Sequence, residues 1–365
     1  MKAAVLYKAN TPLEIVELTQ EAPRAGEARV KVMAAGICHS DWHIMNGDWT
    51  PPLPMVLGHE AAGIVEEVGP GVTTVKPGDH VIFSFRPHCG RCRYCTQGRT
   101  VLCIGRAAVP PGALYDGTLR IKHKGQGINQ MARIGTFSEF VVCPAEMLVP
   151  IRKEMPWPQA ALVGCCVPTG VGAVTSCARV EAGASVLVIG CGGVGLNVVQ
   201  GARLAGAGMI VAADLLDSKL GYAKEFGATH TLNAKQDNVV ERVRELTEGR
   251  GVDYAFDAIG GEQTTLQILD AIRPGGVAVI VGMAAMAVRA PITPYMMALQ
   301  EKTLKGTMYG SVRPPIDFPR LVELYLDGRL KLDQLVSRTY TLEEINEGFK
   351  ALTSGQVARG VVVFN

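Results

Sequence analysis

The segment "SVLVIGCGGVGLNVVQ", residues 185–200, decides the fold of this chain. An apolar run typical of a buried strand leads into a glycine-rich turn, and a helical pattern follows the turn. The G-x-G-x-x-G spacing of this turn lets the backbone approach a pyrophosphate closely, and the N–H groups at the start of the helix favour its charge. We therefore predict a dinucleotide site there, with Gly190, Gly192, Gly193, Val194 and Gly195 as cofactor-binding residues.

An acidic residue follows the glycine turn at the spacing that a dinucleotide site needs. Asp214 ends the next apolar run, "MIVAAD", about 20 residues beyond the turn. A carboxylate at this point can bind the ribose hydroxyls of adenosine, and it repels the 2′-phosphate of NADP. The following residues, "LLDSK", contain no arginine that could bind this phosphate. The sequence therefore predicts NAD as the cofactor.

The rest of the chain shows two other patterns. From about residue 180, apolar runs such as "VDYAFDAIGG" alternate with helical patterns, which predicts a parallel sheet covered on both faces. Earlier segments, such as "ARVKVMAAG", are short and alternating and predict an irregular β domain. The last strand, "RGVVVFN", is expected to return to that domain. The predicted division is 1–167 and 310–365 for one domain and 168–309 for the inserted one.

Length and composition limit the kinds of partner. A chain of 365 residues suits two domains at about 150 residues each. The net charge of +2 gives no reason to expect nucleic acid or an anionic membrane as a partner. Neither a secretory leader nor an apolar run of about 20 residues stands out in the sequence. We expect a cytoplasmic protein that binds small molecules.

Four of the ten cysteines lie close together in "CGRCRYCTQGRTVLC". The cytosol keeps thiols reduced, so this spacing favours a metal site over disulfides. Four thiolates can complete a tetrahedral shell around zinc and leave no position open, which is typical of a structural site. An iron–sulfur cluster is the alternative. The predicted ligands of the structural zinc are Cys89, Cys92, Cys95 and Cys103.

A second metal site is suggested by residues far apart in the sequence. Cys38 in "GICHSDWH" and His59 in "GHEAAG" suit a catalytic zinc, which takes three protein ligands and keeps a fourth position open. The third ligand could be Cys165 or Cys166 in "VGCCVPTGVG". Adjacent side chains point in different directions, so only one of these two can bind the metal.

Together these motifs resemble the zinc-dependent medium-chain alcohol dehydrogenase family from "MKAAVLY" to "RGVVVFN". The resemblance implies a GroES-like catalytic domain with an inserted Rossmann domain. It also implies two zinc ions per chain and NAD-linked interconversion of an alcohol and an aldehyde. By the same resemblance Cys165 is the third catalytic ligand. Cys166 is then expected to face away as a small apolar filler, for which the Rossmann sheet is one candidate surface.

The resemblance also assigns roles around the catalytic zinc. Asp41 would orient His59, and Glu60 would sit behind the metal and exchange with water. Ser40 and His43 match a proton relay that carries the alcohol proton to the surface. The remaining implied cofactor contacts are His39 and Arg359 for the pyrophosphate, Lys219 for the adenosine ribose and Thr169 for the nicotinamide.

Two aromatic residues are expected in the substrate pocket. Trp49 stands where glutathione-dependent formaldehyde dehydrogenases carry an acid, and Phe85 matches a second pocket residue. Apolar surface there favours primary alcohols with an apolar or aromatic tail. A thiol-dependent formaldehyde dehydrogenase or S-nitrosothiol reductase is the alternative, and a catalytically silent NAD-sensing protein is an alternative from another class. The segment 104–135, with "DGTLR", resembles the longer members, so we expect a homodimer, with a tetramer as the alternative.

Overall fold

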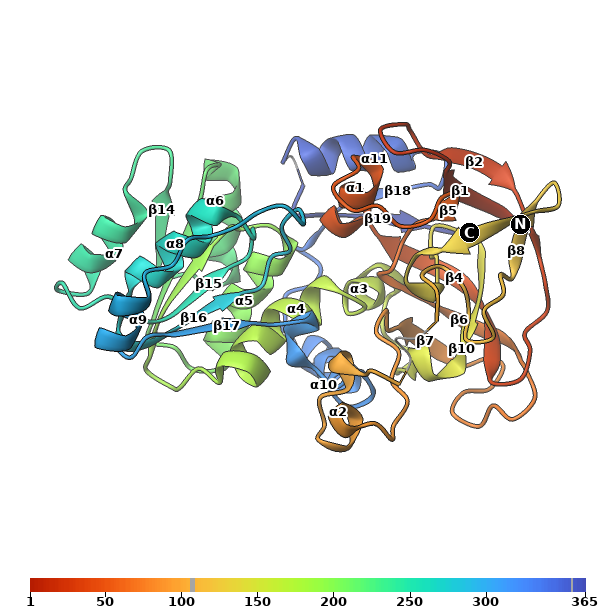
Figure 1. Ribbon diagram of the computed structural model, residues 1–365, viewed down its shortest axis with the longest axis horizontal. Helices are drawn as coiled ribbons and strands as arrows, with labels where there is room; N and C mark the ends of the chain where they lie inside the picture. Colours follow the sequence, from red (N-terminus) through yellow and green to blue (C-terminus); the bar gives the residue numbers. More distant parts are fainter. Residues whose placement is uncertain (106–108, 356) are drawn as a thin grey trace. The chain divides into compact units, whose positions relative to one another are not determined.

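A computed structural model describes residues 1–105, 109–355 and 357–365 (Figure 1). The chain forms two compact units. Unit 1 contains residues 1–165 and 313–365, and unit 2 contains residues 166–312. Unit 1 is thus built from both ends of the chain, and unit 2 is an insertion within it.

Unit 1 is built around a seven-stranded sheet in which β4 is central, because it pairs with β6, β10 and β19. Buried and half-buried residues alternate along the first part of β4, as its sequence predicts. The final strand β19 lies antiparallel to β4, with Val361 opposite Gly36, so the tail does return to the first domain (Figure 1). The strands of this sheet are β4 (Glu27–Gly36), β6 (Ala61–Val68), β7 (His80–Phe83), β10 (Phe140–Pro144), β11 (Leu148–Pro150), β18 (Val336–Tyr340) and β19 (Arg359–Val363).

The other elements of unit 1 surround this sheet. A six-stranded sheet has the order β2-β1-β5-β9-β8-β3, with β1 (Lys2–Leu6), β2 (Glu14–Glu17), β3 (Thr19–Gln20), β5 (Met55–Val56), β8 (Ile121–His123) and β9 (Gln126–Gln130). The α-helices are α1 (His39–Met45), α2 (Arg93–Thr96), α3 (Trp157–Leu162), α10 (Pro314–Leu326) and α11 (Ile345–Thr353). Short 3₁₀ turns are η1 (Thr100–Leu102), η2 (Met131–Arg133) and η3 (Ala145–Met147). One apolar core joins the two ends of the chain, since Ile37, Phe137 and Phe349 are all buried in it.

Unit 2 has a six-stranded sheet in the order β14-β13-β12-β15-β16-β17, and every neighbouring pair is parallel. The predicted doubly wound sheet is thus confirmed. The strand order reverses at β12, and ligands of such sheets bind at the carboxyl ends of the strands at this point. The strands are β12 (Ser185–Ile189), β13 (Met209–Asp214), β14 (His230–Asn233), β15 (Val252–Asp257), β16 (Ile272–Ile280) and β17 (Thr303–Gly306).

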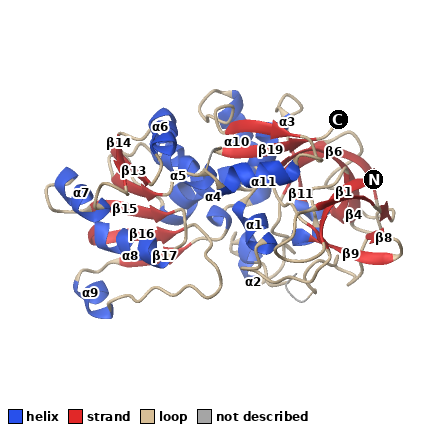
Figure 2. Cartoon of the chain, turned by 90° about the horizontal axis from the view of Figure 1, so that it is seen from above, coloured by secondary structure: helices blue, strands red, loops and turns tan. Residues whose placement is uncertain are grey.

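Helices alternate with these strands along unit 2 (Figure 2). They are α4 (Cys166–Gly172), α5 (Gly193–Leu204), α6 (Asp217–Phe226), α7 (Val239–Leu246), α8 (Glu262–Ala271) and α9 (Pro294–Leu299). A π-helical turn, η4 (Ala173–Ala178), follows α4, and a 3₁₀ turn, η5 (Tyr309–Ser311), closes the unit. None of the helices in the described ranges is long and apolar enough to span a bilayer.

Candidate metal centres and nucleotide-binding turn

Three side chains that can bind a metal meet in unit 1. Ligand atoms of Cys38, His59 and Cys165 all lie within 4.8 Å of one another, and all three residues are buried. Cys38 is the N-cap residue of α1, and the N–H of Cys165 donates to the carbonyl of Leu162 at the end of α3. Two thiols and one imidazole form a three-ligand set that suits zinc with an open fourth position. Sequence reasoning left the choice between Cys165 and Cys166 to the resemblance, and the structure brings Cys165 to the other two.

One buried carboxylate ties the loops of this centre together. Oδ1 of Asp41 lies 3.3 Å from Nδ1 of His59 and accepts the N–H of Gly58 at 2.9 Å, while Oδ2 accepts the N–H of Cys38 at 3.3 Å. A carboxylate can only accept, so Nδ1 of His59 carries the proton, and in the neutral ring Nε2 is then free for a metal. Gly58 has a φ of +92°, and a Cβ there would lie 2.6 Å from Thr136 Oγ1, so this turn requires glycine.

Charged groups lie next to the two cysteines. A hydrogen bond between the two thiols lowers the pKa of Cys38 well below its ordinary value and raises that of Cys165, and Arg359 also lowers the pKa of Cys38. Nη1 of Arg359 lies 3.6 Å from Oε2 of Glu60 and donates to the carbonyl of Ile37 at 2.9 Å. Arg359 is 3% exposed and Glu60 is fully buried. The residue predicted to bind pyrophosphate thus lies beside Glu60, and its positive charge favours a thiolate at Cys38.

The predicted relay and pocket residues are in the same part of unit 1. Ser40 is half-buried in the first turn of α1, while His39 is exposed. The ring of Phe85 meets the ring of His59 edge-on, with their centroids 5.2 Å apart. The ring of Trp49 stacks on that of His43 at 4.8 Å. Aromatic surface therefore adjoins both a candidate metal ligand and the candidate relay histidine.

Asp48 is a residue that sequence reasoning missed. Its Oδ2 lies 2.7 Å from Nδ1 of His43. The available signal was weak, because aspartate beside glycine is typical of an ordinary turn. Only the turn through Gly47, whose φ is +84°, brings the two side chains together.

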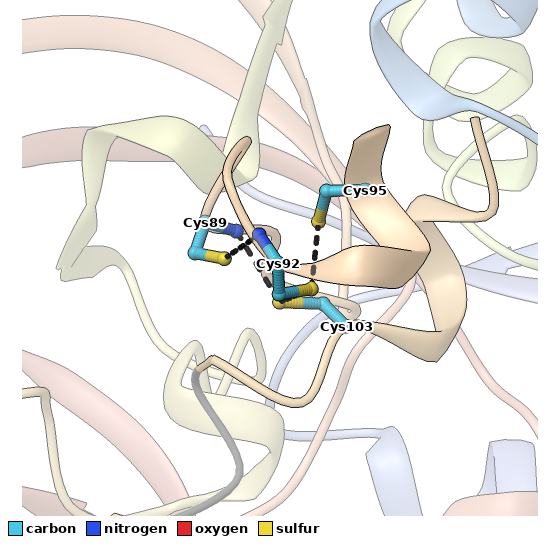
Figure 3. Close-up of side chains that lie close together, drawn as sticks. All are labelled: Cys89, Cys92, Cys95 and Cys103. Atoms are coloured by element: carbon cyan, nitrogen blue, oxygen red, sulfur yellow. Dashed lines mark hydrogen bonds between the residues drawn. The ribbon is translucent and has the colours of Figure 1, made fainter. Parts of the chain in front are cut away.

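The four-cysteine cluster forms a compact thiol site in unit 1 (Figure 3). All of its cysteines are free of disulfides, and Sγ of Cys92 lies 3.6 Å from that of Cys95 and 3.9 Å from that of Cys103. Backbone N–H groups donate to the sulfurs, and those of Cys95, Ile104 and Gly105 lower the pKa of Cys92 to about 5. A Cβ on Gly105 would lie 2.5 Å from Sγ of Cys89, so glycine is needed there. This cluster suits a closed zinc site.

The glycine turn of unit 2 has the geometry of a phosphate cradle. Gly190 has a φ of +93°, and a Cβ on Gly195 would lie 1.7 Å from the carbonyl oxygen of Gly190. A Cβ on Gly192, the N-cap of α5, would meet nothing within 4 Å. The turn is therefore tightly packed at its base and open at the helix N-terminus, the kind of position that suits a pyrophosphate. Gly193 and Val194 form the first turn of the same helix.

Asp214 organises the glycine turn as well as ending β13. Its Oδ2 accepts the N–H of Cys191 at 2.7 Å, and its Oδ1 accepts the N–H of Leu216 at 3.1 Å. Sequence reasoning predicted the ribose contact but not these two bonds. Thr169 is buried in α4, and Lys219 is half-buried in α6.

The second cysteine of the pair, Cys166, has surroundings of its own. Cys166 is fully buried, but it begins α4, and its Sγ lies 3.9 Å from Nδ2 of Asn197 on α5. It therefore contacts an amide group on the neighbouring helix α5. The reason is the close approach of α4 to α5, where a Cβ on Gly170 would lie 2.5 Å from Cβ of Asn197.

Comparisons with known proteins agree with these features. The alcohol dehydrogenase GroES-like domain family matches residues 24–153, and the zinc-binding dehydrogenase family matches residues 193–327. An NDMA-dependent alcohol dehydrogenase of Amycolatopsis methanolica is 44% identical, over 99% of this chain and 98% of the relative. An S-(hydroxymethyl)glutathione dehydrogenase of Paracoccus denitrificans is 40% identical, over 100% of this chain and 99% of the relative.

A solved structure is also similar. The crystal structure of benzyl alcohol dehydrogenase from Acinetobacter calcoaceticus has a TM-score of 0.94 and 32% identity, and the match covers 100% of this chain and 99% of that one. The chain belongs to the zinc-dependent medium-chain alcohol dehydrogenase family, with a GroES-like domain and a Rossmann domain. It is an oxidoreductase that acts on alcohols, so the silent NAD-sensing alternative is set aside.

Proposed function

We propose that this enzyme transfers hydride reversibly between NAD and primary alcohols with an apolar or aromatic tail, giving aldehydes. The observation that carries the substrate class is the pair of aromatic rings beside the candidate metal centre: Phe85 against His59, and Trp49 against His43. Flat apolar surface of this kind favours an aromatic or aliphatic tail over a charged one. The similarity to a benzyl alcohol dehydrogenase supports the same class.

The chain's own residues divide the chemistry as follows. Zinc bound by Cys38, His59 and Cys165 would supply a Lewis acid for the alcohol hydroxyl. Asp41 holds His59 in the tautomer that leaves Nε2 free, and Ser40 and His43 would carry the released proton towards solvent.

NAD would be bound by unit 2 and would supply the hydride acceptor. The open N-terminus of α5 would bind its pyrophosphate, with His39 and Arg359 as further proposed phosphate contacts. Asp214 and Lys219 would meet the adenosine ribose, and Thr169 would meet the nicotinamide. Glu60 would stand behind the metal as an exchangeable ligand.

The proposal is tested by NADH formation with a series of alcohols on zinc-loaded enzyme. We expect kcat/KM for benzyl and long-chain primary alcohols to exceed that for ethanol by at least about tenfold, since each buried methylene contributes about 1–3 kcal/mol of discrimination. Equal activity on ethanol and benzyl alcohol would refute the proposed pocket.

The similarity to an S-(hydroxymethyl)glutathione dehydrogenase favours one second candidate, oxidation of a formaldehyde–thiol adduct. Trp49 cannot form the charge-assisted hydrogen bond by which an acid would read a glutathione adduct. We therefore expect formaldehyde with glutathione to be a poorer substrate than benzyl alcohol, and the opposite ranking would favour this candidate. An assay with NDMA as acceptor belongs in the same series, because a relative is named for it.

Cofactor choice gives a further prediction. Asp214→Gly should raise kcat/KM with NADP by about tenfold or more and lower it with NAD, because the carboxylate that repels the 2′-phosphate is removed. Asp214 also holds the glycine turn, so a loss with both cofactors would contradict the predicted switch and would show that the carboxylate acts mainly on the turn. Asp217→Asn is the matched control, since Asp217 is exposed at the start of α6 and bonds to Asn233. The measurement is initial rate against each cofactor.

We further propose that the partner is a second copy of this chain. Unit 2 exposes several large apolar side chains over residues 283–299: Met283 (53% exposed), Met286 (75%), Tyr295 (71%) and Leu299 (62%). Exposed apolar side chains concentrated in one segment of the chain suit an interface between subunits. Light scattering that gives the mass of a monomer would overturn this proposal.

A further inference from the structure

The hydrogen bond between His43 and Asp48 has a chemical direction. Nδ1 of His43 lies 2.7 Å from Oδ2 of Asp48, and a carboxylate can only accept. Nδ1 therefore carries the proton, and in the neutral ring Nε2 is the atom that can accept one. We propose that Asp48 is a positioning residue that fixes His43 in this tautomer, so that Nε2 stays available as the acceptor of the relay. This inference rests on the proposed role of His43 in proton transfer.

The turn that follows α1 holds Asp48 in place. Nδ2 of Asn46 donates to Oδ2 of Asp48 at 2.9 Å, and the N–H of Asp48 donates to Oδ1 of Asn46 at 3.2 Å. The N–H of Trp49 donates to the carbonyl of His43 at 2.9 Å, which closes the turn on the end of the helix. The hydrogen bond from His43, followed by that from Asn46, lowers the pKa of Asp48. Asp48 is therefore ionised at neutral pH and accepts from His43 as a carboxylate.

Two neighbouring side chains hold the imidazole of His43, one stacked on its face and one hydrogen-bonded to its edge. Trp49 stacks on its face at 4.8 Å with an angle of 26° between the rings, while Asp48 bonds its Nδ1 edge. The His43 side chain is 20% exposed. These contacts fix the plane of the ring while the ring keeps access to solvent. A residue that passes a proton out of the protein needs both a fixed orientation and this access.

The other groups near this turn do not compete for Nδ1 of His43. Asp41, on the same helix, is fully buried and bonds to Cys38, Gly58 and His59. Asn10, from the connection between β1 and β2, packs its neutral amide near Gly47. Asp48 is thus the charged group that the turn brings to His43, and its removal leaves both neutral tautomers open to the ring.

The test reads the tautomer separately from activity. The chain has seven histidines, so selective ¹⁵N-histidine labelling of the zinc-loaded enzyme gives few signals, and His43→Gln assigns the one from His43. We expect the protonated Nδ1 form in the native protein and a shift towards protonated Nε2 in Asp48→Leu. Asp48→Asn keeps an oxygen acceptor and should retain much of the native tautomer. Asp79→Leu is the matched control, because Asp79 accepts from a backbone N–H in another turn of unit 1 and should leave the signal unchanged.

Kinetics then separate positioning from damage to the pocket. Asp48→Leu should lower kcat for benzyl alcohol about five- to tenfold with KM changed by less than about twofold, since only proton acceptance is impaired. An unchanged His43 tautomer in Asp48→Leu would overturn the inference, as would a rise in KM with kcat unchanged. A changed tautomer with unchanged kcat would also overturn it. In that case the rate of His43→Gln shows which proposal has failed. A rate equal to that of the native enzyme would mean that the proposed relay through His43 is itself wrong.

Discussion

Replacing Cys165 by serine should remove one zinc ion per chain and reduce alcohol oxidation to about a thousandth or less. Sγ of Cys165 is one of three ligand atoms within 4.8 Å of one another, and serine is a poor zinc ligand beside a thiolate and an imidazole. Loss of the Lewis acid removes several kcal/mol of transition-state stabilisation, and each 1.36 kcal/mol is tenfold in rate. The measurements are zinc content by elemental analysis and NADH formation on the same preparation.

Cys166→Ser is the matched control, because it makes the same change one residue along. Cys166 contacts Asn197 and belongs to neither of the two candidate metal clusters. Both zinc ions and most of the activity should therefore remain. The reverse pattern, in which Cys166→Ser loses zinc and Cys165→Ser keeps it, would show that the metal ligand had been assigned to the wrong cysteine.

Arg120→Met should lower the free energy of unfolding of unit 1 by about 3–5 kcal/mol, because it leaves a buried carboxylate without its partner. Arg120 is fully buried, and it donates from Nε to Oε2 of Glu27 at 2.9 Å and from Nη2 to Oε1 at 2.5 Å. It also reaches Oδ2 of Asp116 at 2.7 Å. Denaturant unfolding followed by fluorescence measures the change. The ion pair between Arg120 and Glu27 gives the "DGTLR" segment a structural role, because it links that segment to the start of β4.

Two controls identify the cause of that loss. Lys122→Met breaks an exposed ion pair with Glu21 on a neighbouring part of the same segment and should cost less than about 1 kcal/mol. Adding Glu27→Gln to Arg120→Met should recover part of the stability, because the buried charge is then gone. Equal losses for Arg120→Met and Lys122→Met would contradict the argument from burial.

The same cluster sets a pH dependence. Burial by itself would raise the pKa of Asp116, but hydrogen bonds from Arg120 and Thr118 lower it. A carboxyl whose pKa is lower in the folded protein stabilises it above the unfolded pKa of about 3.9 and loses this contribution as the pH falls towards the folded pKa. The decrease in the free energy of unfolding below about pH 4 should therefore be smaller in Arg120→Met than in the native protein.

Much of the site could be predicted because its parts are local in the sequence. Gly190, Gly192 and Gly195 form one turn, and Asp214 follows at the end of the next strand, so spacing alone places them together. The four cysteines of the cluster are also close together in the sequence, so their spacing predicts the cluster. The structure adds the reason for the glycine that follows them, since a Cβ on Gly105 would lie 2.5 Å from Sγ of Cys89.

The missed features depend on tertiary contacts that spacing does not encode. Arg359 meets Glu60 only because β19 returns beside β4, and Cys166 meets Asn197 only because α4 packs on α5. Asp48 is close to His43 in sequence, yet its carboxylate reaches the imidazole only through the left-handed Gly47. In each case the path of the backbone decided which partner the side chain meets.

The pairing of β19 with β4 has a consequence for the order in which the protein is made. The N–H of Ile37, the residue before Cys38, donates to the carbonyl of Gly360 at 2.9 Å, so the sheet that leads into the candidate catalytic site includes β19, more than 300 residues further along the chain. The ribosome synthesises Cys38, His59 and Cys165 long before that strand. Unit 2 has all of its own strands by residue 312 and can close while the chain is still growing. The candidate zinc ligands of unit 1, although translated first, gain their complete scaffold only after unit 2 has been made.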